Sequence, residues 1–450
     1  MSLSSFVLLY YIFAWHFFPI VSTSIELKPI INNLKLPIES FLNLFMVLCI
    51  MVLSFKIYSE KHKCKTLSVV KYKYSESEIW LLGIIGIFAF ILSWVFGAKN
   101  VNKINTSPLF AITDVAPLMY APFVLVMSNV VYIKEAKVNR YLLILYAFIF
   151  VFLSMISNRR ATVASVFLIP IYILMFAIYI KRYDYRKFLK QKYFVLLLLL
   201  YPIFSFVSDF GYAILSVRGE RGDVEPIEMI DKTIEAMQDE EKLQSIKDRF
   251  VSDDEVKVDN NKAWDEYYVN NMFFSRQGNV KYVDLSLIYA DKIKGNEILD
   301  RYFDFVISLF PQFVIDYCGF KVDKSESVLC SLGDYMLYYG DNNRYALFGK
   351  RLGNICGLGW VCFGALFPIV LFLIMFLVYS ALDIFVVVEN GMFYISLIGA
   401  LHLQKLISIF AFHEGISSYT GFVFRGMLNY IFLATIMYVI ANIYRKLRML

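Results

Sequence analysis

The sequence has little charge and few of the residues that build soluble active sites. Charged residues make up 18% of its 450 residues, and it has 4 histidines and 6 cysteines. A soluble domain is about a quarter charged, whereas 59% of this chain is hydrophobic and its mean hydropathy is +0.58. A core shielded from water cannot hold that much apolar surface, so the lipid bilayer must solvate much of the chain.

Several catalytic and nucleotide-binding motifs are also missing. The sequence has no G-x-x-x-x-G-K-[ST] loop, which argues against ATP-driven transport by this chain alone. It lacks G-x-S-x-G, H-E-x-x-H and C-x-x-C, and four histidines make a histidine-rich metal site improbable. The basic residues flank apolar runs, which follows the positive-inside rule and argues against nucleic-acid binding. No internal repeat is present.

Ten apolar runs have about the length of a membrane span. They lie at 4–24, 38–56, 79–97, 109–132, 140–157, 161–180, 193–211, 353–379, 384–409 and 425–443. The first lacks a basic n-region and an A-x-A-like cleavage site, so we expect a retained span. The fourth carries Asp114 and Pro117, which favour a broken or re-entrant helix. The sequence thus predicts an all-α, polytopic transmembrane bundle of about ten spans.

Loop charges predict the orientation. Basic residues concentrate in 57–77, in 133–140, in 181–192 and in the C-terminal tail. Ten spans place these four regions and the N-terminus on one side, which should be cytoplasmic. Residues 211–350 hold 26 acidic and 17 basic side chains, whereas the rest of the chain carries a net charge of +15. We therefore expect three parts: a bundle of seven spans (1–210), a periplasmic loop (211–350) and three further spans (351–450).

The long loop shows helical patterns rather than disorder. Apolar residues recur at helical spacing from Pro226, which suits the first turn of a helix. The run ILDRYFDFVISLFPQF is aromatic and amphipathic, as in helices that lie at the membrane interface or cover a cavity. Cys318 and Cys330 either pair as a disulfide or stay as two thiols.

Three groups of residues on the predicted outer side could bind an anion. Arg159 and Arg160 lie in a turn between spans, where the alternative is that they reach lipid headgroups. Arg218 and Arg221 follow the seventh span in SVRGERGD, where the alternative is a solvated helix end. His413, Glu414 and Arg425 lie between the last two spans, where a packed structural histidine is the alternative. Arginine pairs with two phosphate oxygens at once, so these groups predict a site for a lipid-linked diphosphate.

This layout resembles the O-antigen polymerase family, which polymerises oligosaccharide repeat units. The resemblance rests on many spans, one large late loop, Arg218-Gly219 and Arg221-Gly222 at the loop start, Asn158-Arg159-Arg160, and the LFPQF run. The pair His413 and Arg425 is similar to one in the related O-antigen ligases. The family has eleven to fourteen spans in many members, more than the ten expected here.

The resemblance implies a GT-C-like glycosyltransferase in the bacterial inner membrane. Its substrate would be an undecaprenyl-diphosphate-linked oligosaccharide, and a further partner would regulate chain length. The five arginines would bind the diphosphate, His413 or Glu414 would act as the base, and no nucleotide, cofactor or metal would be needed. Two alternatives stay open: an O-antigen ligase, and, from another class, a lipid-linked oligosaccharide flippase. Spans nearly free of charge argue against the flippase.

Overall fold

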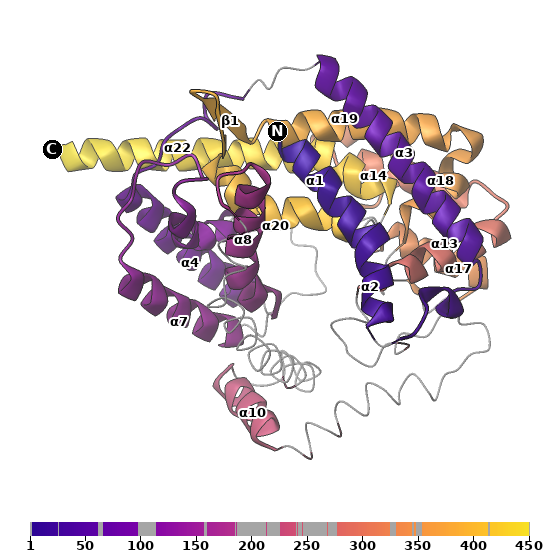
Figure 1. Ribbon diagram of the computed structural model, residues 1–450, viewed down its shortest axis with the longest axis horizontal. Helices are drawn as coiled ribbons and strands as arrows, with labels where there is room; N and C mark the ends of the chain where they lie inside the picture. Colours follow the sequence, from indigo (N-terminus) through magenta and orange to yellow (C-terminus); the bar gives the residue numbers. More distant parts are fainter. Residues whose placement is uncertain are drawn as a thin grey trace. The chain divides into compact units, whose positions relative to one another are not determined.

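The computed structural model is mostly helical, which agrees with the expected fold class apart from one short two-stranded sheet (Figure 1). The described residues are 2–25, 27–61, 66–97, 114–156, 160–184, 186, 213, 226–239, 241, 245, 268, 277–324, 330–343, 346–347, 353–412 and 415–449.

The chain forms two compact units, each built from segments that are far apart in the sequence. Unit 1 comprises Met1–Lys71, Asn261–Asn390 and Lys405–Ile436, and unit 2 comprises Tyr72–Asn260, Gly391–Gln404 and Met437–Leu450. Each unit therefore draws on the predicted N-terminal bundle, the long polar loop and the C-terminal spans. The three-part division by membrane topology stays a prediction.

Five helices in the described part of the chain are long and apolar enough to cross a membrane. They are Leu3–Ser24, Pro37–Lys61, Glu76–Ser93, Ile355–Asp383 and Ile416–Arg448. They coincide with the first, second, third, eighth and tenth of the predicted spans. These helices indicate a membrane protein, because each offers an apolar length close to the ~30 Å of a bilayer core.

The other five predicted spans either correspond to shorter helices or lie outside the described residues. Four correspond to shorter apolar helices, Ala116–Met127, Arg140–Leu153, Leu168–Tyr179 and Leu397–Ala411, and the predicted span 193–211 lies outside the described residues. The ninth differs most from its prediction. Instead of one helix, residues 384–409 contain strands β1 (Val386–Glu389) and β2 (Met392–Ile395) before α20 (Leu397–Phe412) begins. Asn390 and Gly391 both have positive φ in the turn between the strands, as a tight hairpin requires.

Unit 1 is built around the first, second and eighth predicted spans. Its elements are α1 (Leu3–Ile12), the π-helix η1 (Phe13–Phe17), α2 (Phe18–Ser24), η2 (Ile30–Asn33), α3 (Pro37–Lys61), α18 (Ile355–Phe363), η8 (Gly364–Leu366) and α19 (Phe367–Asp383). Figure 1 shows α3 and α19 side by side, and Ser54 Oγ donates to the Phe372 carbonyl at 3.0 Å. Tyr379 donates to the Met51 carbonyl at 3.2 Å, so polar groups within this helix pair satisfy one another.

A buried carboxylate connects α1, α3 and α19 at one end of unit 1. Asp383, at the end of α19, accepts hydrogen bonds from the Ser4 backbone N–H at 2.9 Å and from Ser4 Oγ at 2.8 Å. Tyr58, near the end of α3, donates to the same carboxylate at 3.1 Å. The start of α1 and the ends of α3 and α19 therefore lie at one end of unit 1.

The long polar loop supplies a layer of helices at the opposite end of unit 1. We call this layer the cap layer; it consists of α13 (Val280–Lys292), α14 (Glu297–Ser308) and α17 (Leu332–Asp341). Asp284 of α13 is fully buried and accepts from the backbone N–H groups of Lys35 and Leu36 at 3.1 and 2.6 Å, just before α3 begins. At Gly357 in α18, an added Cβ would lie 2.3 Å from the Ser286 carbonyl oxygen. The cap layer thus contacts the first turns of two candidate spans.

Unit 2 contains a further set of helices among the described residues. They are α4 (Glu76–Gly97), η3 (Ala116–Tyr120), α6 (Ala121–Val124), η4 (Leu125–Met127), α7 (Arg140–Ile156), α8 (Arg160–Tyr179) and α10 (Pro226–Gln238). α10 begins at Pro226, as predicted. The broken helix η3–α6–η4 also matches its prediction. It lies so close to α4 that an added Cβ on Gly86 would overlap the Met119 backbone nitrogen at 1.9 Å. A glycine at that position is what allows the two backbones to meet.

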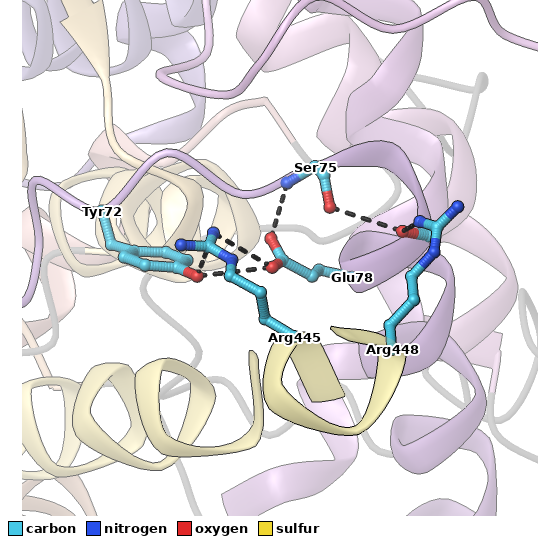
Figure 2. A network of polar contacts seen from close by, with 6 residues as sticks. Tyr72, Ser75, Glu78, Arg445 and Arg448 are labelled. Carbon is cyan, nitrogen blue, oxygen red and sulfur yellow. Dashed lines mark hydrogen bonds and ion pairs between the residues drawn. The ribbon is translucent and has the colours of Figure 1, made fainter. Parts of the chain in front are cut away.

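Figure 2 shows a polar network in unit 2 at the start of α4 and the end of α22 (Met427–Met449). Glu78 is buried and accepts from the Ser75 backbone N–H at 2.7 Å, which is half of a capping box. Arg445 Nη2 donates to Glu78 at 3.2 Å and to the Tyr72 hydroxyl at 2.6 Å. Burial and the nearby Glu78 charge raise the pKa of Tyr72, so its hydroxyl stays protonated at neutral pH. The network ties two basic segments, 57–77 and the tail, together in space.

Arg445→Ala is expected to lower the free energy of unfolding by about 1 kcal/mol, because Glu78 would lose its cation while keeping its other donors. The measurement is the thermal midpoint of the purified protein in detergent. Lys446→Ala is the matched control, since Lys446 is exposed, lies next to Arg445 on α22 and is not among the residues of the network in Figure 2. Equal midpoints for the two variants would show that the network does not stabilise unit 2.

Candidate functional site

The structure describes only part of the predicted anion site. Arg425 is fully described, and Arg160 is described as the first residue of α8. The other predicted site residues lie outside the described residues: Arg159, Arg218, Arg221, His413 and Glu414. The convergence of the arginines on one cavity therefore stays a prediction, and Arg425 is the centre of the described part of the site.

Arg425 lies in a π-helix inserted between two α-helices of the last candidate span. This segment, η9 (Phe422–Gly426), follows α21 (Ile416–Gly421) and precedes α22, and the Met427 N–H bonds back to the Phe422 carbonyl. A π-helix adds one residue to the turn, and such insertions are frequent at functional sites. The Arg425 side chain is exposed. An exposed cation on an otherwise apolar span is available to an anionic partner.

Lys324, from the polar loop, belongs to unit 1, as Arg425 does. Its Nζ donates to the Phe310 carbonyl oxygen. Burial, followed by the positive charge of Arg425, lowers the pKa of the Lys324 ammonium, and the carboxylate of Asp316 opposes this shift. The charge of Arg425 thus disfavours the charged form of Lys324. An anion placed between them would relieve their repulsion.

Helix α14 of the cap layer docks onto the span that carries Arg425. Tyr302 and Thr420 share a hydrogen bond of 3.0 Å, and Thr420 Oγ1 also donates to the Ile416 carbonyl at 2.8 Å. Because the Thr420 hydroxyl has one hydrogen, Tyr302 must be the donor between them. Burial raises the pKa of Tyr302, which keeps that hydroxyl protonated. The contact fixes the cap layer within about one helical turn of η9.

The segments that adjoin this contact in sequence carry many exposed aromatic rings. They come from α14, from α15 (Gln312–Tyr317), from the residues on either side of α15 and from η9: Phe303, Phe310, Phe313, Tyr317, Phe320 and Phe424. Tyr317 is 92% exposed and Phe313 is 74% exposed. Rings of this kind, mixed with cations, are typical of the zone where a membrane meets water. The predicted amphipathic character of this run agrees with the helix found there.

The cysteines of the loop remain separate thiols. Cys318 is exposed and Cys330 is buried, and both are free. The disulfide considered from the sequence is therefore not formed in this structure.

Sequence reasoning missed two residues of this site. Lys324 is one of many lysines in a polar loop, and no motif around it indicates that the charge of Arg425 acts on it. Tyr302 lies inside the aromatic run noted above, but its hydrogen bond to Thr420 depends on two segments more than a hundred residues apart. The helical spacing that places Tyr302 on the buried face of α14 was the available signal.

Comparison of the chain with known protein families, with curated proteins and with solved structures found no match.

Proposed function

We propose that this protein is a membrane glycosyltransferase that polymerises lipid-linked oligosaccharide repeat units. The substrate is undecaprenyl-diphosphate-linked oligosaccharide, and the product is O-antigen or a related surface polysaccharide. In this proposal the fold is GT-C-like, the protein lies in the bacterial inner membrane, and the cap layer faces the periplasm. Both termini face the cytoplasm.

The exposed Arg425, on the π-helix η9 of an apolar candidate span onto which α14 docks, is the observation that carries the proposal. The charge of Arg425 also disfavours the charged form of Lys324, and an anion would relieve this repulsion. Exposed aromatic rings lie on α14 and η9, where the polar loop meets the candidate spans. A diphosphate carried on a membrane lipid fits this setting. Its charge suits the cations, and its polyprenyl chain suits the apolar spans below.

The proposed reaction breaks one bond and forms one. A sugar hydroxyl of the incoming repeat unit attacks the anomeric carbon of the growing glycan, and the bond from that carbon to the diphosphate breaks. The bonding electrons leave with the undecaprenyl diphosphate, whose added negative charge Arg425 and Lys324 would stabilise. His413 or Glu414 would take the proton of the attacking hydroxyl. Arg159, Arg160, Arg218 and Arg221 are proposed as further diphosphate ligands.

Reconstitution tests the reaction directly. Purified full-length protein is placed in vesicles together with the lipid-linked repeat unit isolated from the producing cells, and products are separated by length. The proposal predicts a ladder of longer glycans that remain attached to the lipid, formed without added nucleotide. Vesicles without the protein should contain single repeat units only.

The two alternative functions give different results in the same assay. A ligase would leave single units unless a lipid A core acceptor were added, and would then transfer glycan to that acceptor. A flippase would move single units across the vesicle membrane without lengthening them. Either result would overturn the polymerase proposal.

A further inference from the structure

Four segments of unit 2 meet around a pair of tyrosines. Tyr74 and Ile133 form a β-bridge, and the Tyr132 N–H donates to the Ile395 carbonyl at 2.7 Å. These backbone contacts bring Tyr132 and Tyr394 together, with ring centroids 5.8 Å apart in an edge-to-face arrangement. The tyrosine pair is thereby held by backbone pairing rather than by flexible side-chain contacts alone.

A cation covers each ring of this pair. Lys73 Nζ lies 4.8 Å from the centre of the Tyr132 ring, and Arg182 Cζ lies 4.7 Å from the centre of the Tyr394 ring. Both distances lie within the ~6 Å range of a cation–π contact. The cations come from two of the basic segments, 57–77 and 181–192, that the charge pattern assigns to the cytoplasmic side. We call this arrangement the cation–tyrosine cluster.

The end of α8 sets the position of Arg182. Lys181 has a positive φ of 58°, and the Arg182 N–H bonds back to the Ala177 carbonyl at 2.9 Å. This is the geometry of a Schellman cap, which turns the chain sharply after a helix. Arg182 is therefore held at the very end of an apolar helix, where the edge of a bilayer would lie.

Part of the Arg182 guanidinium is buried without a hydrogen bond. Its Nη2 has no partner among the described residues. The neighbouring carboxylate, Asp184, accepts from the Arg186 N–H at 3.0 Å instead. A buried donor without an acceptor is unfavourable. Since Tyr394 covers one face of the guanidinium, its edge is the part left to bind an oxyanion.

We propose that the cation–tyrosine cluster binds the phosphate of an anionic membrane-lipid headgroup. The guanidinium edge would donate to phosphate oxygens, and Lys73 would add a second positive charge. A lipid is favoured over free phosphate because α8 continues from the cluster as an apolar helix with exposed Ile171 and Met175. Those side chains offer a surface for acyl chains. Basic sites at the cytoplasmic ends of membrane helices commonly bind such headgroups.

Lipid titration of the purified full-length protein tests this site. The probe is dioctanoyl phosphatidylglycerol, and binding is followed by the rise in thermal midpoint at increasing lipid concentration. Wild type should show a saturable rise, and Arg182→Gln should weaken the apparent affinity at least about tenfold, because a charge-assisted hydrogen bond to phosphate is lost. Lys181→Gln removes the same charge one residue earlier, from an exposed position, and should bind like wild type.

Further arms of the titration separate the explanations. Arg182→Lys keeps the charge but loses the planar fork, so it should bind with intermediate affinity. It replaces Arg182→Gln as the test if Arg182→Gln proves too unstable to measure. Dioctanoyl phosphatidylcholine should give no comparable rise. Unchanged affinity in Arg182→Gln or Arg182→Lys would overturn the proposal. An equal rise with inorganic phosphate alone would also overturn it, because the site would then recognise a free anion.

Discussion

Arg425→Ala is expected to reduce glycan polymerisation by about 100-fold or more while leaving protein levels normal. Removing one preorganised donor to developing negative charge commonly costs a factor of this size. Because the Arg425 side chain is exposed on η9, its loss should not disturb packing. The measurement is the rate of ladder formation by the purified variant in vesicles that contain the lipid-linked repeat unit.

Two further variants separate charge from geometry at this site. Arg425→Lys keeps a positive charge without the planar fork and should retain an intermediate rate. Lys324→Ala should also slow polymerisation, since the positive charge of Arg425 acts on the Lys324 ammonium and an anion bound by Arg425 would attract both. Lys446→Ala, at the far end of α22, is the matched control and should be as active as wild type. Normal rates in Arg425→Ala and Lys324→Ala would remove the basis for the diphosphate site.

Asp284→Ala should destabilise unit 1 by about 2–4 kcal/mol, because it leaves the partly buried N–H groups that this carboxylate binds without their acceptor. Asp284 is fully buried and holds the N–H groups of Lys35 and Leu36, and Ser40 Oγ lies 3.3 Å from the same carboxylate. These hydrogen bonds join α13 to the start of α3. The variant should therefore also release the cap layer, which limited proteolysis would detect as faster cleavage.

Asp291→Ala provides the comparison for this effect. Asp291 lies on the same helix, but its side chain is exposed, so its removal should change stability by less than about 0.5 kcal/mol. The readouts are the thermal midpoint in detergent and the rate of proteolysis. If Asp284→Ala behaved like Asp291→Ala in both, the cap layer would not depend on this carboxylate for its attachment.

Hydropathy predicted the long helices well because a bilayer demands an unbroken apolar length. The predicted runs 38–56 and 353–379 correspond to α3 and to α18–η8–α19. Composition alone could not show that the second of these bends at Gly364, where φ is +49°. In 384–409 the Asn-Gly pair was a hairpin signal, but the apolar residues on both sides of it resembled a span. In this segment the turn residues, rather than the average hydropathy, determined the local structure.

The site was harder to predict than the helices. An arginine at the start of an apolar run stands out in any sequence, so Arg425 was identified. Lys324 and Tyr302 were not, because their roles come from tertiary interactions: the charge of Arg425 acts on Lys324, and Tyr302 hydrogen-bonds to Thr420. The polar loop was expected to lie over the spans, and α13 and α14 do pack on them. The individual residues that make this contact carry no distinguishing pattern in the sequence.

The proposed function requires the cap layer to face the periplasm, because the lipid-linked repeat unit is proposed to react at the periplasmic surface. Cys318 reports this orientation directly, since its thiol is free and exposed beside α15. Spheroplasts are treated with a membrane-impermeant maleimide, and Cys318→Ser identifies the labelled position. A periplasmic cap layer predicts labelling of Cys318 while the membrane is intact. Labelling only after the membrane is permeabilised would place the cap layer in the cytoplasm and contradict it.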